Sequence, residues 1–292
     1  MIALITLTFG QKKFIKKFLH NKAAVFSLSI IVLVIIAAIF APIVAPYNPA
    51  QQFTNGLTAS GMPKGPNHQF KLGTDLLGRD LFTRLIFGAR VSMLIGIVAN
   101  GVAVLIGTFL GTLAGYYQKK LGTTIMRFTD LMMAFPALLL AIALTSILRP
   151  SMWIVALVIA LVNWVQVARV IYAQVLAIRE SEFIEAAVAV GASTRRILYR
   201  HVLPHLVPTL LVYGTLGIST TVLLESTLSF LGVGVRPPTP SWGGIINESQ
   251  TYFLDAPWLV FFPGLAILLT SLAFNLIGDA LRDCFGHEGG SI

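Results

Sequence analysis

The sequence predicts an all-α integral membrane protein with six transmembrane helices. Three observations lead to this fold class. Of the 292 residues, 56% are hydrophobic and only 11% are charged, whereas soluble domains carry about 25% charged residues. Six apolar runs have close to, or more than, the roughly 20 residues needed to cross a bilayer core. Between the runs, lysine and arginine gather in alternate connecting segments, the pattern that orients membrane proteins.

The apolar runs carry few or no charges, and turn-rich or basic segments separate them. Because six is an even number, both ends of the chain are expected on the same side of the membrane. The runs are 23–45, 91–118, 131–148, 151–178, 206–231 and 256–278.

The distribution of basic residues places both ends in the cytoplasm. With a cytoplasmic amino terminus, 14 of the 21 Lys and Arg residues fall on the cytoplasmic side. Five of the remaining seven lie in one long loop, where the charge rule is weak. We therefore expect a basic cytoplasmic tail over 1–22 and a second cytoplasmic tail over 281–292.

The first run is too long for a cleaved signal sequence. Signal-peptide apolar regions span about 7 to 15 residues, whereas 23–45 is longer and ends in APIVAPYNP without a clear small-residue cleavage site. It is interpreted as a retained transmembrane helix. The four lysines before it, Lys12, Lys13, Lys16 and Lys17, either bind an anionic leaflet or only set the topology.

Residues 46–90 are expected to form a long extracytoplasmic loop. Proline and glycine exclude regular structure from its first part. Apolar residues at helical spacing over 76–86, with Asp80 and Arg84 four positions apart, predict a short helix on the membrane surface. The remaining core, 91–280, contains the other five transmembrane helices.

The second apolar run carries Gly107, Gly111 and Gly115 at four-residue spacing. A face of small residues allows close approach of two helices in lipid, either within this chain or with a second membrane subunit. In the third and fourth runs, Asp130 is expected to pair with Arg127, and Arg169 is expected to reach the interface.

The largest cytoplasmic loop, 179–205, is interpreted as a helix, a break and a second helix. Its boundaries are set by caps at Ser181 and at Ser193 or Thr194, a stop at Gly191 and a break at Pro204. The first helix has an apolar stripe with small alanines and no membrane of its own. Such a stripe predicts insertion into a groove of a partner protein; the alternative is an ordinary surface loop whose arginines enforce topology.

The sequence shows few motifs that are typical of an enzyme. It lacks the Gly-x-x-x-x-Gly-Lys-Ser/Thr phosphate loop of an ATPase. Cys284 is the single cysteine, which excludes a disulfide within the chain and a cysteine-based metal site. His201 and His205 are four residues apart, but a third ligand is not evident. A nucleic-acid partner is not expected, because the basic residues face the inner leaflet.

Several stretches identify a family resemblance over most of the chain. The segment EAAVAVGASTRRILYRHVLP (185–204) resembles the cytoplasmic signature loop of ABC importer membrane subunits. LGTDLLGRD (72–80), DLMMAFPALLLAI (130–142), SFLGVGVRPPTPSWGGIIN (229–247) and AFNLIGDALRD (273–283) resemble the dipeptide, oligopeptide and nickel permease branch, and the long first loop resembles its C-type subunit. The resemblance implies a type I ABC importer fold in a bacterial or archaeal plasma membrane.

The resemblance also implies partners and site residues. The chain would form half of a translocation pathway with a B-type permease subunit, receive peptides from an external solute-binding protein, and dock on two cytoplasmic ATPase subunits that bind ATP and Mg. No cofactor is expected in this chain itself. The implied ATPase-docking residues are Glu182, Phe183, Glu185, Ala186, Ala187, Gly191, Ala192, Arg195, Leu203 and Pro204. The candidate path residues are Ser219, Thr220 and Glu225, although Glu225 is equally suited to a hydrogen bond with a neighbouring helix.

Other functions stay open on the sequence. The branch also moves nickel chelates, opines and glutathione, and its specificity resides largely in the external binding protein. A different class, an ion-coupled secondary transporter, is disfavoured by the few buried acidic residues and by the absence of paired broken helices in matching halves.

Overall fold

The computed structural model describes residues 17–148 and 151–286, and within these ranges the protein is built from helices and loops without a β-strand. The basic residues Lys12, Lys13 and Lys16, the short connection 149–150 and the tail 287–292 lie outside the described residues. The elements in chain order are α2 (Lys22–Ile39), α3 (Ala41–Val44), η1 (Thr54–Gly56), α4 (Leu81–Tyr117), α5 (Lys119–Met133), α6 (Ala137–Ile147), α7 (Met152–Arg179), α8 (Glu182–Ala189), α9 (Thr194–Ile197), the π turn η2 (Leu198–Val202), α10 (Leu203–Phe230), α11 (Trp242–Glu248), η3 (Gln250–Tyr252) and α12 (Trp258–Gly286).

Among the described residues, five helices are long and apolar enough to cross a membrane, and a bent pair brings the total to six. The five are α2, α4, α7, α10 with its preceding turns, and α12. The pair is α5 and α6, which meet at 86°. The expected run 131–148 therefore contains a bend, between the end of α5 and the start of α6. Pro136 at the bend lacks an N–H and disfavours the helical conformation of the residue before it, so it favours a break at this point.

The long helices form a bundle in which α4 and α7 lie against each other over most of their lengths. The small face of α4 makes this possible. An added Cβ at Gly107 would stand 2.6 Å from the Val167 Cβ, and one at Gly111 would stand 2.5 Å from the Ala168 carbonyl oxygen. The glycine face therefore packs within this chain, on α7.

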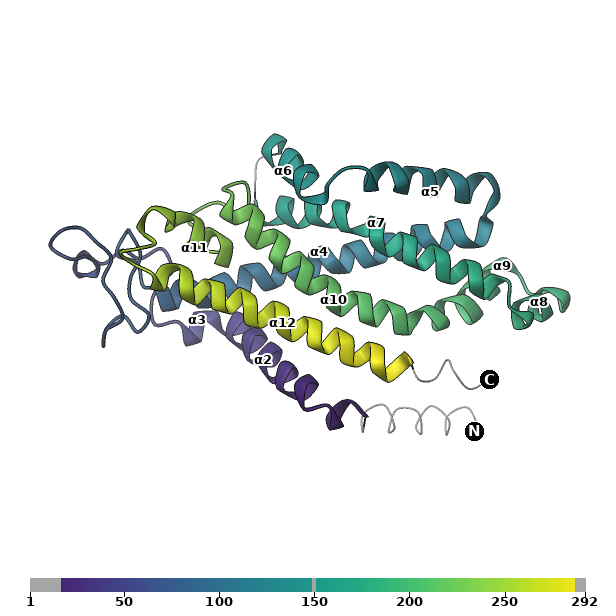
Figure 1. Ribbon diagram of the computed structural model, residues 1–292, viewed down its shortest axis with the longest axis horizontal. Coiled ribbons are helices and arrows are strands. Elements are labelled where there is room, and N and C mark those ends of the chain that lie inside the picture. Colours follow the sequence, from purple (N-terminus) through teal and green to yellow (C-terminus); the bar gives the residue numbers. More distant parts are fainter. Residues whose placement is uncertain (1–16, 149–150, 287–292) are drawn as a thin grey trace.

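The two ends of the bundle carry different elements (Figure 1). The loop end holds the segment 46–80, α3 and α11. The opposite end, here called the docking end, holds α8 and α9, the start of α2 and the end of α12. There the Lys17 Nζ donates a hydrogen bond to the Asp283 carbonyl oxygen. The described chain thus starts and finishes at the same end, as an even number of crossings requires; the side of the membrane on which this end lies stays a prediction.

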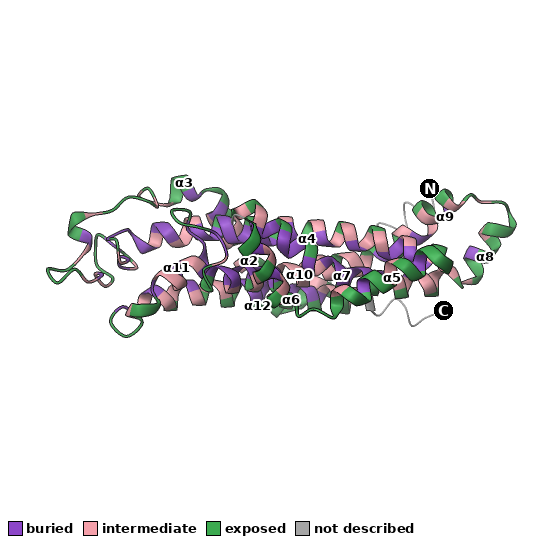
Figure 2. Ribbon diagram, turned by 90° about the horizontal axis from the view of Figure 1, so that it is seen from above, coloured by how far each residue is buried: buried purple, intermediate pink, exposed green. Residues whose placement is uncertain are grey.

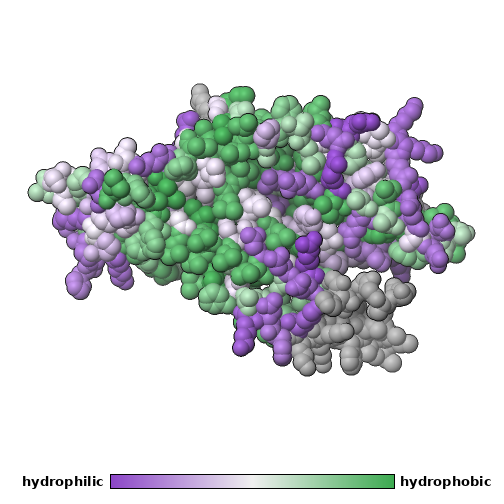
Figure 3. Space-filling model, viewed as in Figure 1, coloured by the Kyte–Doolittle hydropathy of each residue, from purple (hydrophilic) through white to green (hydrophobic). Residues whose placement is uncertain are grey.

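The surface between the two ends is apolar. In the space-filling view, hydrophobic side chains cover the middle of the visible face and hydrophilic ones gather toward both ends (Figure 3). Large apolar side chains of the long helices are exposed, including Phe26 of α2 and Leu105 and Phe109 of α4, which are 65%, 71% and 65% exposed. Such a belt suits contact with lipid or with another membrane helix.

The short surface helix expected over 76–86 was wrong. Helix α4 begins only at Leu81 and continues to Tyr117 without a break. Asp80 caps it, because its Oδ2 accepts a hydrogen bond of 2.7 Å from the Thr83 backbone N–H. Leu81, Leu85 and Ile86 therefore lie in the first turns of a transmembrane helix, whereas Leu76 and Leu77 lie in the loop before it. The rest of 46–80 is mostly irregular, in keeping with its proline and glycine content.

Candidate docking surface and polar sites of the bundle

Helix α8 projects from the docking end and is held to it by one buried side chain. Ile184 is 3% exposed and packs in an apolar cluster that includes Val175 of α7, Ile197 of α9 and Leu206 of α10. The rest of α8 is largely exposed (Figure 2). This buried anchor couples a protruding helix to two transmembrane helices. Ile184 was not among the expected site residues, although it lies inside the apolar stripe that predicted the helix.

The turn after α8 has the hydrogen-bond pattern of a Schellman motif. The Ala192 N–H donates to the Ala187 carbonyl oxygen at 3.0 Å, and the Gly191 N–H donates to the Val188 carbonyl oxygen at 2.9 Å. Gly191 has φ +81°, a left-handed conformation that glycine adopts without a Cβ penalty. The expected stop at Gly191 is confirmed.

The caps of the loop are only partly as expected. Ser181 stands at the start of α8 but makes no capping bond; its Oγ donates instead to the Ile178 carbonyl oxygen at 2.5 Å, so the predicted cap was wrong. Ser193 caps α9 by accepting a hydrogen bond from the Arg196 N–H at 3.4 Å. Of the two candidate caps for the second helix, the structure selects Ser193, and Thr194 is the first helical residue.

Pro204 does not separate the second helix from the fifth transmembrane run. Residues 194–230 form one continuous helical stretch. A proline in a helix lacks an N–H and clashes with the carbonyl four residues earlier, but the wide π turn over 198–202 precedes it, with the Leu203 N–H bonded to the Leu198 carbonyl oxygen. The wider turn accommodates the proline without a break. The second part of the loop 179–205, from Thr194 onward, is therefore joined to α10 by continuous helix.

The expected docking residues form two groups by exposure. Those on the outer side of the loop are exposed and free to meet a partner: Glu182, Phe183, Glu185, Ala186, Gly191, Arg195 and Pro204. Those nearer the bundle are half-buried: Ala187, Ala192 and Leu203. The Phe183 ring stacks on the His205 ring at 5.2 Å between centroids. Beside α8, a groove opens toward the ends of α4 and α7 and is lined by Tyr116, Arg179, Ile184, Glu185 and Val188, among others.

The three candidate path residues on α10 lie in different environments. Ser219 is fully buried, whereas Thr220 is exposed. Glu225 is also fully buried, and its Oε2 accepts a hydrogen bond of 2.8 Å from the Ser92 Oγ of α4. The sequence left two roles open for Glu225, a residue of the path or a partner in a hydrogen bond between helices. The structure shows the hydrogen bond to a neighbouring helix.

Asp130 pairs with Arg169 rather than with Arg127. The Arg169 guanidinium on α7 contacts the Asp130 carboxylate on α5, and both side chains are about half exposed. The expected pairing with Arg127 was wrong because α5 lies against α7, which brings the more distant arginine within reach.

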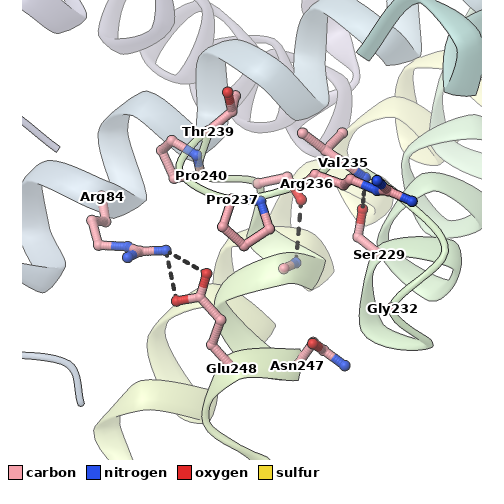
Figure 4. A pocket seen from close by; sticks show the side chains of 12 residues that line it. Arg84, Ser229, Gly232, Val235, Arg236, Pro237, Thr239, Pro240, Asn247 and Glu248 are labelled. Carbon is pink, nitrogen blue, oxygen red and sulfur yellow. Dashed lines mark hydrogen bonds and ion pairs between the residues drawn. The ribbon is translucent and has the colours of Figure 1, made fainter. Parts of the chain in front are cut away.

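Four charged side chains form a cluster at the loop end that sequence spacing did not reveal; three are buried, and the Glu248 side chain is 25% exposed. The Asp75 Oδ2 contacts the Arg79 Nε at 2.6 Å and an Arg84 terminal nitrogen at 2.8 Å. The Glu248 Oε2 of α11 contacts the same two arginines at 2.6 and 3.0 Å. Figure 4 shows the Arg84–Glu248 pair at the edge of a small polar pocket. Burial raises the pKa of Asp75 and of Glu248, and the Arg79 charge opposes the rise.

This cluster replaces the Asp80–Arg84 pair expected on the surface helix. Asp75 and Arg79 come from the loop, Arg84 from the first turn of α4, and Glu248 from the end of α11, 164 residues further along the chain. Because two positive and two negative charges neutralise each other, Asp75 and the two arginines can be buried while Glu248 stays partly exposed. The cluster thereby fixes the long loop and α11 to the start of α4.

Solved structures of an ABC transporter share this fold. The inward-facing crystal form of the MetNI methionine ABC transporter matches with a TM-score of 0.58 over 69% of this chain and 96% of that chain, at 20% sequence identity. A second crystal form of the same transporter matches with the same TM-score. At this identity the likeness concerns the fold alone, which is the type I ABC importer permease fold.

Sequence comparisons then give the family. Residues 107–287 match the family described as binding-protein-dependent transport system inner membrane component, and residues 11–60 match the N-terminal TM domain of oligopeptide transport permease C. The chain belongs to this family of ABC importer permeases and to its C-type branch. An ion-coupled secondary transporter is therefore excluded.

Similar curated proteins cover nearly the whole chain. The di/tripeptide transport system permease protein DppC of Pseudomonas aeruginosa is 42% identical over 93% of this chain and 90% of its own length. The dipeptide transport system permease protein DppC of Alkalihalophilus pseudofirmus is 42% identical over 92% and 86%. The glutathione transport system permease protein GsiD of Pectobacterium atrosepticum is 38% identical over 93% and 89%.

Proposed function

We propose that this chain forms half of the translocation pathway of an ATP-driven importer of short peptides. The relatives named for dipeptides, tripeptides and glutathione support this substrate class, since glutathione is itself a peptide. The other half comes from a B-type permease subunit, and an external solute-binding protein delivers the peptide. The chain lies in the plasma membrane of a bacterium or archaeon, with the docking end in the cytoplasm, where the positive-inside rule places its basic loop.

The protruding helix α8 is the observation that carries this proposal. It exposes an outer side with Glu182, Phe183 and Glu185, while Ile184 fixes its inner side to α7 and α10. An ATPase subunit that receives the outer side in a cleft transmits its movement through Ile184 to two transmembrane helices. Continuous helix from Thr194 to Phe230 supports the same mechanical link. ATP and Mg are bound by the two ATPase subunits, and this chain catalyses no reaction.

Charge reversal on α8 tests the docking. In the complex with its ATPase subunits, Glu185→Lys places a cation on the exposed side of α8 and is expected to release the ATPase subunit without unfolding the membrane part. Asp255→Lys makes the same charge change at an exposed position of the loop end and serves as the matched control. Co-purification of ATPase with Glu185→Lys at the level of the control, together with full transport, would contradict the proposal.

Uptake into proteoliposomes tests the substrate. The complex is reconstituted with its binding protein and supplied with ATP inside the vesicle, and uptake of a dipeptide, a tripeptide, glutathione and a nickel chelate is compared. Peptide uptake that depends on ATP is expected. Uptake of the nickel chelate alone would contradict the peptide class while leaving the docking intact.

A further inference from the structure

Helix α11 sits in the loop end of the bundle as a short inserted element. It spans seven residues, too few to be stable by itself in water, so its position depends on its contacts. Trp242 is 1% exposed and its Nε1 donates to the Leu85 carbonyl oxygen at 3.1 Å. Backbone approach is close as well, because a Cβ at Gly243 would stand 2.2 Å from the Ser226 carbonyl oxygen. Helix α11 thus contacts α4, α10 and α12.

Two hydrogen-bond relays converge on the Glu225 carboxyl beneath α11. In the first, the Trp242 backbone N–H donates to the Ser92 Oγ at 3.4 Å, and the Ser92 Oγ donates to the Glu225 Oε2 at 2.8 Å. In the second, the Val235 N–H donates to the Ser229 Oγ at 3.2 Å, and the Ser229 Oγ donates to the Glu225 Oε1 at 2.8 Å. Each carboxyl oxygen therefore ends one relay.

The relays connect parts of the chain that are distant in sequence. Glu225 and Ser229 belong to α10, Ser92 belongs to α4, and the two backbone donors lie in the loop before α11 and in its first residue. Glu225, Ser92 and Ser229 are all buried. An apolar side chain would fill this space at less cost, because a buried carboxyl is expensive unless it is satisfied by hydrogen bonds. Directional bonds of this kind specify one arrangement and are lost together when the elements separate.

We propose that α11 is a closure element of the loop end and that the Glu225 carboxyl is the latch that holds it against α4 and α10. Glu225 is a positioning residue: it acts on the pathway through α11, without touching the transported peptide. The four-charge cluster at Glu248 holds the far end of the same helix. The contacts of the latch stand by themselves, whereas its role in transport rests on the proposed function. If the latch has this role in transport, α11 separates from Ser92 and Glu225 when the pathway opens to the outside.

A thiol at Ile245 reports the position of α11. Ile245 is 1% exposed in α11, so Ile245→Cys in a Cys284→Ser background reacts slowly with a water-soluble thiol reagent while α11 is seated. The chain is tested alone in detergent and in the full complex. In this background, Glu225→Ala is expected to raise the labelling rate about tenfold or more, because the bonds of both relays are lost. Glu225→Gln keeps the shape and part of the bonding and is expected to label at an intermediate rate.

The matched control is Thr227→Val. Thr227 is half-buried on α10, the helix that carries Glu225, and its hydroxyl donates to the Leu223 carbonyl oxygen of that helix, so labelling is expected to stay at the parental rate. In the full complex, a non-hydrolysable ATP analogue is expected to raise labelling of the parent, while Glu225→Ala labels fast with or without it. If α11 stays in place throughout the transport cycle, the analogue leaves the labelling rate of the parent unchanged, and this result would contradict the role of α11 in transport.

Two further variants keep the latch testable if Glu225→Ala does not fold. Ser92→Ala breaks the relay to Trp242 in α11, whereas Ser229→Ala breaks only the relay to Val235. The proposal predicts fast labelling of Ile245→Cys with Ser92→Ala and slow labelling with Ser229→Ala. Equal labelling in these two variants, or a parental rate in folded Glu225→Ala, would overturn the latch. Failure to assemble with ATPase subunits while Glu225→Ala still labels fast would refute only the proposed function.

Discussion

Replacing Gly191 by alanine isolates the backbone contribution to the docking surface. Gly191 has φ +81°, and a Cβ built there meets no described atom within 4 Å. Alanine therefore adds no collision and carries only the cost of the left-handed conformation, about 1 to 2 kcal/mol. Because the turn sets where the end of α8 lies, this cost is expected to loosen α8 locally and to leave the bundle folded.

The expected consequence is weaker binding of the ATPase subunit. A cost of about 1 to 2 kcal/mol corresponds to a loss in affinity of about 5- to 30-fold. The assay measures binding of the purified ATPase subunit to the permease pair in nanodiscs, together with the unfolding midpoint of the membrane part. Gly191→Asn is the control, since asparagine adopts the left-handed conformation more readily than alanine. Parental affinity in Gly191→Ala, or an equal loss in both variants, would refute the reasoning.

Three further substitutions test the bundle itself through the thermal unfolding midpoint of the purified chain. Gly111→Leu places a side chain where a Cβ already stands 2.5 Å from the Ala168 carbonyl oxygen, and it is expected to separate α4 from α7 and prevent folding; a folded variant would contradict the packing. Arg84→Gln removes a charge whose side chain is 1% exposed and is expected to cost about 3 kcal/mol. Arg169→Gln breaks a half-exposed pair and is expected to cost less than about 1 kcal/mol. Equal shifts in these two arginine variants would show that burial does not decide the cost.

Much of the fold follows from local sequence. Apolar runs of membrane-crossing length predict the long helices. Gly191 ends α8 because glycine readily adopts the left-handed conformation that the turn requires. The bend between α5 and α6 also has a local signal, Pro136, which a search for uncharged runs overlooks. The start of α4 at Leu81 was missed for a similar reason: the external loop and the helix share an apolar pattern, and only the Asp80 cap marks the boundary.

The polar sites bring together residues that lie far apart in the sequence, so local spacing does not predict them. Glu225 finds its partner Ser92 at a separation of 133 residues, so spacing left both of its roles open. Arg84 meets Glu248 across 164 residues, and the nearer Asp80 suggested the wrong pair. Similarly, Asp130 meets Arg169 only because α5 folds back against α7. Local sequence specifies the helices of this protein. The packing of those helices then decides which ionisable groups meet.

Crosslinking from opposite ends of the molecule tests the central claim most directly. Val190, beside α8, is 90% exposed, and Leu254, between α11 and α12, is 88% exposed. In a Cys284→Ser background, a photocrosslinker on Val190→Cys is expected to capture the ATPase subunit in the assembled importer, whereas the same reagent on Leu254→Cys captures the external binding protein and no ATPase. Capture of the ATPase from Leu254→Cys, or from neither position, would contradict a docking role for α8.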